Sequence, residues 1–282
     1  MEKPIIALLY DFDKTLCTTD MEDYTFIPAL GYQPAEFWKK ANTFGFTNRM
    51  DGLLAYMYTM IEECRAQNIR LDRDFLVRCG HGIELFPGVK DWFGRINAFG
   101  RSLGVDVEHY VISSGLREII EGSGISHEFK EIYAASFCYD EHGVACWPAM
   151  AVNYTSKTQF LFRVNKGVLD VTEHRALNEF MPEEKRRVPF SNMIYIGDGL
   201  TDVPSMKLTK LNGGHSIAVW QEDEQISNEM LLEGRVDFAV KADYSRGSDM
   251  EKMVFAIIDQ IAASAKTAQM HVAACDRAKN AV

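Results

Sequence analysis

Short apolar runs, separated by stretches with helical periodicity, organise most of this chain. The runs are four to six residues long, rich in aliphatic and β-branched side chains, and lie at residues 5–10, 109–112, 193–196, 216–220 and 236–240. Such runs without strict alternation are typical of parallel strands that are covered on both faces. Helical patterns follow at residues 116–121, 158–164, 203–208 and 248–263. This order predicts an α/β fold, with a Rossmann-like open parallel sheet in a three-layer α/β/α arrangement.

One long interval interrupts the alternation of strands and helices. No buried strand is evident there, and amphipathic helices are indicated by the segments PAEFWKKANTF, GLLAYMYTMIEECRAQN and RDFLVRCGHGIEL. The interval is about seventy residues long, which exceeds any ordinary loop in a compact domain. We therefore expect an α-helical domain over residues 17–83, inserted into a core that is formed by residues 1–16 and 84–282.

A smaller interruption lies within the predicted core. Residues 139–143 carry turn-forming side chains between two extended segments, which predicts a β-hairpin insert over residues 132–154. After Ala262 the sequence becomes rich in alanine, and this tail could either extend the last helix or fray.

Composition narrows the classes of partner. The chain has 282 residues, 47% of them hydrophobic, and a formal net charge of −10. This length is ample for a large core, and the acidic balance argues against non-specific binding of nucleic acid or of anionic membranes. An anionic small ligand therefore requires a local positive site. Composition does not predict the oligomeric state.

The cysteines and the apolar runs bear on localisation. The six cysteines are scattered without a CxxC pair, as expected for reduced thiols, although Cys138 and Cys146 flank the predicted turn and could be bridged. The N-terminal apolar run is too short for a signal peptide, and no run approaches the roughly 18 residues that span a bilayer. We expect a cytoplasmic protein that does not associate with membranes.

Two carboxylates follow the first predicted strand. Asp11 and Asp13 are two residues apart, so in an extended chain their side chains lie on the same side, about 6–7 Å apart, while Phe12 points the other way. This arrangement is costly unless a cation or a proton lies between the acids. The alternative is that both acids are solvated in a turn.

The second predicted strand ends in hydroxyl groups. In the sequence VISSGLREII the strand is expected to end at Ser113, and a helix to begin at Gly115, with Ser114 between them. Hydroxyls and free backbone N–H groups at a helix start form an anion site. The alternative is an ordinary serine N-cap.

A third strand also ends in a carboxylate. Asp198 lies between Gly197 and Gly199, which let the backbone bend sharply, and Asp202 follows four residues later. Asp202 could instead cap the next helix, since Pro204 suits a first helical turn.

A lysine at a predicted helix start is the fourth feature. Ser156 and Gln159 have the spacing of a capping box, which would place Lys157 in the first helical turn, where its charge opposes the helix dipole. A nearby anion would remove this penalty. The alternatives are a snorkelling surface lysine at this position, and Lys166 as the functional lysine.

Taken together, these features predict a site at the carboxyl ends of the strands. Several carboxylates beside an anion site indicate a hard divalent cation, and Mg²⁺ is the expected ion. A phosphate ester is the expected anion.

The same residues resemble the haloacid dehalogenase-like hydrolase superfamily. DFDKTL is similar to its DxDx[TV] first motif, Ser113 in VISSG to its second, Lys157 to its third, and GDGLTD to its fourth. The inserted helices resemble the C1-type cap of the phosphoserine-phosphatase-like branch. The spacing from Lys157 to Asp198 is longer than is usual in that branch.

The resemblance implies a role for each of these residues. Asp11 would be the nucleophile, and Asp13 would be the general acid and base. Mg²⁺ would be held by Asp11, the backbone carbonyl of Asp13, and Asp198, with Asp202 as a further acid beside it. The transferring phosphoryl oxygens would be held by Lys157 and by Ser113, Ser114 and Gly115.

The implied activity is hydrolysis of a small phosphate monoester through an aspartyl-phosphate. Dehalogenase members lack an acid two residues after the nucleophile, so Asp13 favours a phosphatase. Phosphotransfer to a hydroxyl acceptor, or a non-catalytic binding role, are the alternatives. A closed cap implies a small phosphorylated metabolite as partner.

The insert supplies candidate residues for reading the substrate. Asp20 and Glu22 lie close after the first motif, where the phosphoserine phosphatases place a substrate-reading acid, but the alignment does not choose between them. Arg49 and Arg65 could bind a substrate carboxylate or could remain solvated helix charges.

Overall fold

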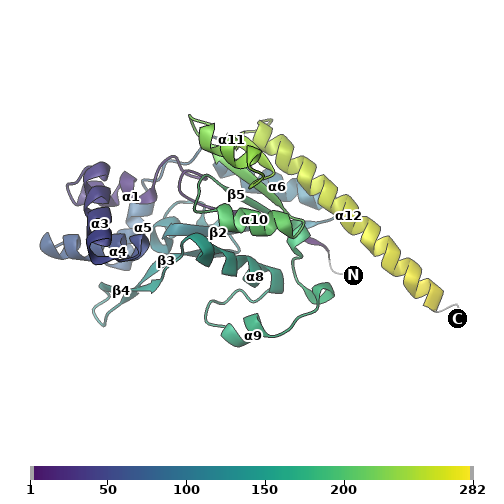
Figure 1. Cartoon of the computed structure of the whole chain (residues 1–282), viewed down its shortest axis with the longest axis horizontal. Coiled ribbons are helices and arrows are strands. Elements are labelled where there is room, and N and C mark those ends of the chain that lie inside the picture. The colour runs from purple at the N-terminus through teal and green to yellow at the C-terminus, as the bar shows by residue number, and fades with distance from the viewer. Residues whose placement is uncertain (1–2, 280–282) are drawn as a thin grey trace.

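The computed structural model describes residues 3–279, and a seven-stranded sheet forms its centre (Figure 1). The strand order is β4-β3-β2-β1-β5-β6-β7, and all neighbouring strands are parallel except β3 and β4. The strands are β1 (Ile5–Tyr10), β2 (Asp106–Leu116), β3 (Glu131–Tyr139), β4 (Ala145–Met150), β5 (Met193–Gly197), β6 (His215–Trp220) and β7 (Phe238–Lys241). The predicted α/β fold class and the predicted hairpin are confirmed.

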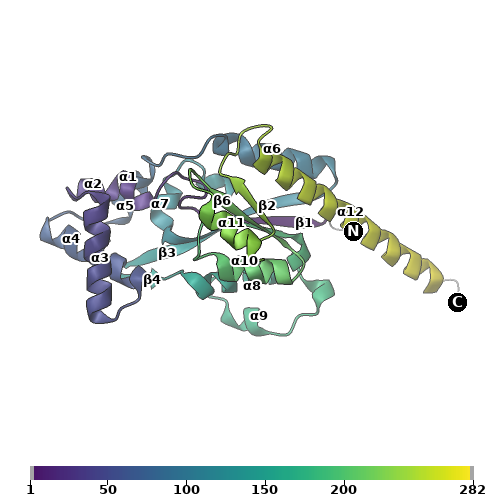
Figure 2. The same ribbon diagram turned by 45° about the horizontal axis from the view of Figure 1, so that its top comes forward.

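Helices cover both faces of the sheet, and the alternation along β1 explains why. Ala7 and Leu9 belong to one buried core, while Ile6, Leu8 and Tyr10 belong to the other. The first core includes side chains of α8 (Thr158–Lys166) and α10 (Val203–Leu211), and the second includes those of α6 (Val89–Ser102) and α12 (Asp249–Lys279). Figure 2 shows the two pairs on opposite sides of the sheet. Shorter helices are α7 (Arg117–Glu121), α9 (His174–Asn178) and α11 (Gln225–Leu232).

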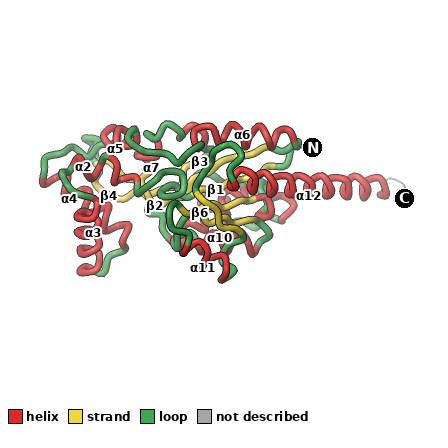
Figure 3. The backbone as a smooth tube through the Cα atoms, turned by 90° about the horizontal axis from the view of Figure 1, so that it is seen from above, coloured by secondary structure: helices red, strands yellow, loops and turns green. Residues whose placement is uncertain are grey.

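Five helices occupy the interval in which no strand was predicted. They are α1 (Met21–Tyr24), α2 (Phe26–Ala29), α3 (Pro34–Asn48), α4 (Gly52–Ala66) and α5 (Arg73–Gly80), and they lie together at one end of the sheet (Figure 3). The chain leaves and re-enters the core side by side, since Cys17 and Leu85 form a bridge and the Thr18 N–H donates to the Glu84 carbonyl at 3.0 Å. The boundary of a separate cap domain at residues 17–83 stays a prediction.

The hairpin of β3 and β4 contacts this helical insert. The Ala145 N–H donates to the Leu71 carbonyl at 2.8 Å, and Asp72 forms a bridge with Val144. The hairpin therefore ties the insert to the edge of the sheet.

One helix was not predicted, and another decides between two alternatives that the sequence left open. The pattern did not reveal α6, whose two glycines weaken its helical signal. The last helix continues through the alanine-rich tail to Lys279, because alanine favours helix, and its second half extends away from the body in Figure 1.

The cysteines are free, so Cys138 and Cys146 are not bridged. Within residues 3–279, no helix has the length and apolar character that crossing a membrane requires.

Candidate active site

The central strand β1 places the site at a switch in strand order. It lies between β2 and β5, and the chain builds the sheet outward from it in opposite directions. Crevices at the carboxyl ends of such strands bind ligands in open α/β sheets. Asp11 follows β1 directly, and its N–H donates to the Ile196 carbonyl of β5 at 2.9 Å. Asp198 follows β5, so Asp11 and Asp198 meet at this edge.

Three carboxylates form a cluster around a buried lysine. Asp11, Asp198 and Asp202 each place an oxygen within 4.8 Å of the others. Lys157 is fully buried, and its Nζ lies 3.1 Å from Asp11 Oδ1 and 2.8 Å from Asp202 Oδ1. Tyr195 of β5 also donates to Asp202 Oδ1, at 2.8 Å. Asp202 Oδ2 is buried without a hydrogen-bond partner.

Asp202 stands at the N-cap of α10, but its side chain makes no capping bond. The helix-capping interpretation of this residue is therefore wrong, because its carboxylate accepts hydrogen bonds from Lys157 and Tyr195 instead. Nothing in the sequence pointed to Tyr195, since a tyrosine within an apolar strand looks like any other core residue.

The lysine motif differs from prediction in its local structure. Residues Tyr154–Lys157 form a 3-10 turn, and the reciprocal capping box joins Asn153 to Ser156 rather than Ser156 to Gln159. Asn153 takes this place because its backbone is extended, as an N-cap requires. Lys157 thus precedes α8, and its full burial excludes a snorkelling surface lysine.

Lys166 lies elsewhere. Its Nζ donates to the carbonyls of Leu177 and Glu179, at 2.5 and 2.6 Å, at the far end of α8. Lys157 is the lysine that the fold brings to Asp11.

The crowding of charges changes the pKa of each group. Burial and the Asp202 carboxylate raise the pKa of Asp11 well above its usual range, and the Lys157 ammonium opposes that rise. Partial burial and Asp202 likewise raise the pKa of Asp198 to about 7. Although burial alone would lower it, the Asp11 and Asp202 carboxylates raise the pKa of Lys157, which stays charged. This cluster is therefore short of positive charge.

Asp13 lies outside the cluster, in a different environment. Its Oδ1 accepts the Met21 N–H at 2.9 Å, and burial, followed by the Glu22 and Asp20 carboxylates, raises its pKa well above the usual range. A Cβ on Gly115 would lie 2.9 Å from Asp13 Oδ2 and 2.0 Å from the Met21 methyl, so any larger residue there would displace the Met21 and Asp13 side chains. The surroundings of Asp13 therefore favour the protonated form of its carboxyl group. The role of its backbone carbonyl toward a metal stays a prediction.

The serine motif is not a helix start. β2 continues to Leu116 through an irregularity after Ser113, and the helix that follows begins only at Arg117. Ser113 Oγ accepts the N–H of Gly115 at 3.0 Å. Ser114 Oγ is buried without a partner, and its carbonyl accepts the Tyr56 hydroxyl at 3.1 Å. Both the helix-start and the N-cap interpretations are wrong, because the backbone stays extended through these residues.

A cavity of about 270 Å³ opens beside Asp13, between the inserted helices and the sheet. Among its lining residues are Asp13, Asp20, Glu22, Trp38, Asn42, Tyr56, Ser114, Gly115, Asn153 and Thr201. Arg49 and Arg65 do not line it. Burial raises the pKa of Glu22 to about 8. The cavity suits a small ligand, since drug-sized ligands occupy about 300–1,000 Å³.

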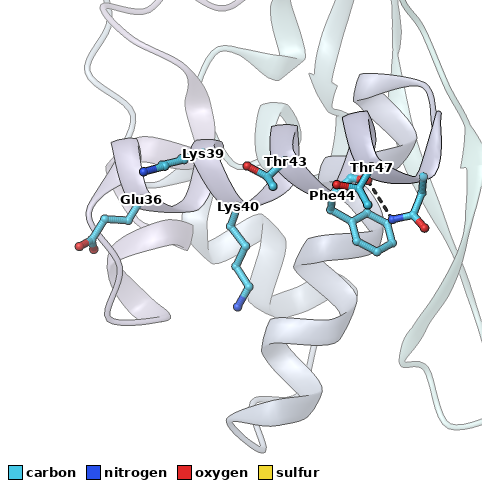
Figure 4. A pocket seen from close by; sticks show the side chains of 7 residues that line it. Glu36, Lys39, Lys40, Thr43, Phe44 and Thr47 are labelled. Carbon is cyan, nitrogen blue, oxygen red and sulfur yellow. Dashed lines mark hydrogen bonds between the residues drawn. The ribbon is translucent and has the colours of Figure 1, made fainter.

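A second hollow lies on α3 (Figure 4). Lys39, Lys40, Thr43 and Phe44 are among the residues that line it, and the Phe44 ring stacks on Tyr58 at 4.7 Å. The lining contains none of the clustered acids, so this hollow is separate from the candidate active site.

The mostly parallel sheet and the acids at its carboxyl edge define an α/β protein with a carboxylate-rich centre. Residues 8–207 match the family model described as haloacid dehalogenase-like hydrolase, which is more than half of the chain. The chain belongs to this family.

Known proteins agree with this fold. An uncharacterised protein of Borreliella burgdorferi is 25% identical over 275 residues, covering 87% of this chain and 94% of that protein. A crystal structure of a HAD family hydrolase from Salmonella enterica serovar Typhi has a TM-score of 0.58 at 14% identity, covering 90% of this chain and 72% of that one. An apo phosphoserine phosphatase has a TM-score of 0.54 at 14% identity, with 84% and 94% covered. At these identities the structures establish the fold alone.

Proposed function

We propose that this protein is a Mg²⁺-dependent phosphatase that hydrolyses a small phosphate monoester through an aspartyl-phosphate on Asp11. The observation that carries the proposal is the pair of carboxyl groups with different environments after β1. Burial raises the pKa of both groups, but the Lys157 ammonium opposes the rise at Asp11, whereas the Glu22 and Asp20 carboxylates add to the rise at Asp13. Separating two carboxyl groups in this way assigns one as nucleophile and the other as acid.

The acid cluster fits a hard divalent cation. Asp11, Asp198 and Asp202 offer carboxylate oxygens, which are the ligands that Mg²⁺ prefers, and Asp202 Oδ2 is a buried acceptor without a partner. When bound there, Mg²⁺ supplies positive charge that keeps Asp11 ionised and offsets the charge of a phosphoryl group.

The first half-reaction uses Asp11 and Asp13. Asp11 Oδ1 is held by the Phe12 N–H at 2.8 Å and by Lys157, which leaves Oδ2 as the attacking oxygen. A bond forms between this oxygen and phosphorus as the bond from phosphorus to the ester oxygen breaks. Asp13 gives its proton to the departing alkoxide, so the leaving group departs as an alcohol.

The second half-reaction returns the enzyme to its starting state. Asp13, now ionised, takes a proton from a water molecule whose oxygen attacks phosphorus. The bond from phosphorus to Asp11 breaks, and inorganic phosphate leaves. We expect Lys157, Ser113 and the unpartnered Ser114 hydroxyl to bind phosphoryl oxygens during both steps.

Replacing Asp11 by asparagine tests the proposal. Asp11→Asn should abolish release of phosphate from a panel of monoesters assayed with Mg²⁺, while circular dichroism shows an intact fold. Asp259→Asn, an exposed position on α12, is the matched control. Hydrolysis by Asp11→Asn at the wild-type rate would refute the mechanism. Analysis of products with an added alcohol acceptor distinguishes hydrolysis from phosphotransfer.

A further inference from the structure

The ionisable side chains that line the cavity beside Asp13 are all acidic. Asp13, Asp20 and Glu22 line it, and no lysine, arginine or histidine does so within residues 3–279. The carboxylate of Asp20 already has a cation, because Lys14 Nζ contacts both of its oxygens at 2.9 and 2.7 Å. Glu22 forms no ion pair in the described structure, and because no cation contacts it to offset its burial, the pKa of its carboxyl group is raised to about 8.

Glu22 is a buried acceptor that the protein itself leaves unsatisfied. The residue is 2% exposed, and its Oε1 is buried with no hydrogen-bond partner. A buried carboxylate in this state is unfavourable unless it is paired or hydrogen-bonded. A ligand that brings a cation to this wall would remove the penalty.

Two aromatic rings complete the lining. Trp38 and Tyr56 have ring centroids 5.5 Å apart at an interplanar angle of 70°. Their polar atoms are already occupied, since Trp38 Nε1 donates to Asp23 at 2.8 Å and the Tyr56 hydroxyl donates to Ser114. The aromatic rings themselves therefore remain to contact a ligand, and aromatic rings attract ammonium groups.

We propose that this cavity binds the leaving group of the substrate, and that the leaving group is a short alcohol bearing an ammonium group and no carboxylate. Glu22 is the specificity-determining residue. A carboxylate on the substrate would meet like charges and no partner cation. This inference rests on the proposed phosphatase function, and it separates the protein from enzymes that act on phosphoserine.

Three esters of similar size test the inference. 2-Aminoethyl phosphate and n-propyl phosphate differ in charge, and O-phosphoserine adds a carboxylate to the former. With Mg²⁺ present, we expect kcat/KM to be at least tenfold higher for 2-aminoethyl phosphate than for either of the others. Equal or faster turnover of n-propyl phosphate or of O-phosphoserine would overturn the inference while leaving the phosphatase function intact.

Glu22→Gln tests whether Glu22 itself, rather than the shape of the cavity, produces the preference for an ammonium group. This variant should lose at least fivefold of the preference for 2-aminoethyl phosphate, measured as the ratio of its kcat/KM to that of n-propyl phosphate. Glu62→Gln, at a partly exposed position on α4 outside the cavity lining, should keep the wild-type preference. An undiminished preference in Glu22→Gln would remove Glu22 from the proposal.

Calorimetric binding of the esters to Asp11→Asn distinguishes failure of the phosphatase function from failure of the cation site. Tenfold tighter binding of 2-aminoethyl phosphate than of n-propyl phosphate, with no turnover by the wild type, would refute the phosphatase function and support the cation site. The absence of both turnover and selective binding would refute both.

Discussion

Replacing Lys157 by methionine should destabilise the fold by an amount that depends on pH. The ammonium lies 3.1 Å from Asp11 Oδ1 and 2.8 Å from Asp202 Oδ1, and it is fully buried. At an effective dielectric constant of about 20, an ion pair at about 3 Å is worth about 5 kcal/mol, against which stands a desolvation cost of several kcal/mol per ion. Removing one partner of a buried pair costs about 3–5 kcal/mol, and we expect the free energy of unfolding to fall by that amount.

The sign of the pH dependence follows from the acids that remain. Without Lys157, the pKa values of Asp11 and its neighbours rise further above those in the unfolded chain. As pH falls, the folded variant takes up protons that relieve the repulsion among the carboxylates, while the unfolded chain does not yet do so. The loss should therefore be larger at pH 8 than at pH 5.

Urea unfolding followed by circular dichroism at both pH values measures this loss. Lys166→Met is the matched control, because its ammonium bonds only to backbone carbonyls. We expect the control to lose about 1–2 kcal/mol of unfolding free energy, by an amount that does not change with pH. A free energy of unfolding for Lys157→Met within about 1 kcal/mol of the wild-type value, with the same dependence on pH as the control, would refute this prediction.

Further expectations concern pH, packing and metal. Burial lowers the pKa of His109 to about 3, so below pH 6.5 the unfolded chain binds a proton that the folded chain does not, and stability falls. Between pH 8 and pH 5 the free energy of unfolding should fall by about 2 kcal/mol from this cause. His109→Gln should therefore show a shallower dependence of stability on pH in urea unfolding. Gly115→Ala would bring a methyl group against Met21 and Asp13, so its kcat should fall at least tenfold, whereas Gly94→Ala, with open space at the Cβ, should leave kcat unchanged. Mg²⁺ should raise the melting temperature of the wild type, with EDTA reversing the shift; an equal shift in Asp198→Asn would argue against a metal at these acids.

Much of the core was predictable because buried parallel strands leave a local signature. The apolar runs at β1 and β5 were found almost to the residue, and the acids that follow them were correctly placed at one edge of the sheet. Lys157 was also identified, although the box that caps its turn was assigned to the wrong residues.

The remainder depends on contacts between distant segments. The extended backbone after Ser113 arises where β2 meets β3 irregularly, a tertiary effect that local propensity does not report. The hydrogen bond from Tyr195 to Asp202 forms because the turn between β5 and α10 brings Asp202 back beside the strand. The long spacing before Asp198 is filled by a segment anchored on Arg163, whose buried guanidinium donates to the carbonyls of Asp170 and Val171 at 2.6 and 3.0 Å. Such an anchor has no signature in sequence.

The position of β1 at the centre of the sheet has a consequence for synthesis of the chain. Its neighbour β2 follows about a hundred residues later, but its other neighbour, β5, begins only at Met193. At about 5–20 residues per second, the ribosome needs roughly 10–40 s to make the segment that separates β1 from β5. During that time β1 can pair at most with β2, and its other edge resembles those through which nascent proteins aggregate. The strand that precedes Asp11 is thus the first strand of the sheet to be made and the one that waits longest for its second neighbour.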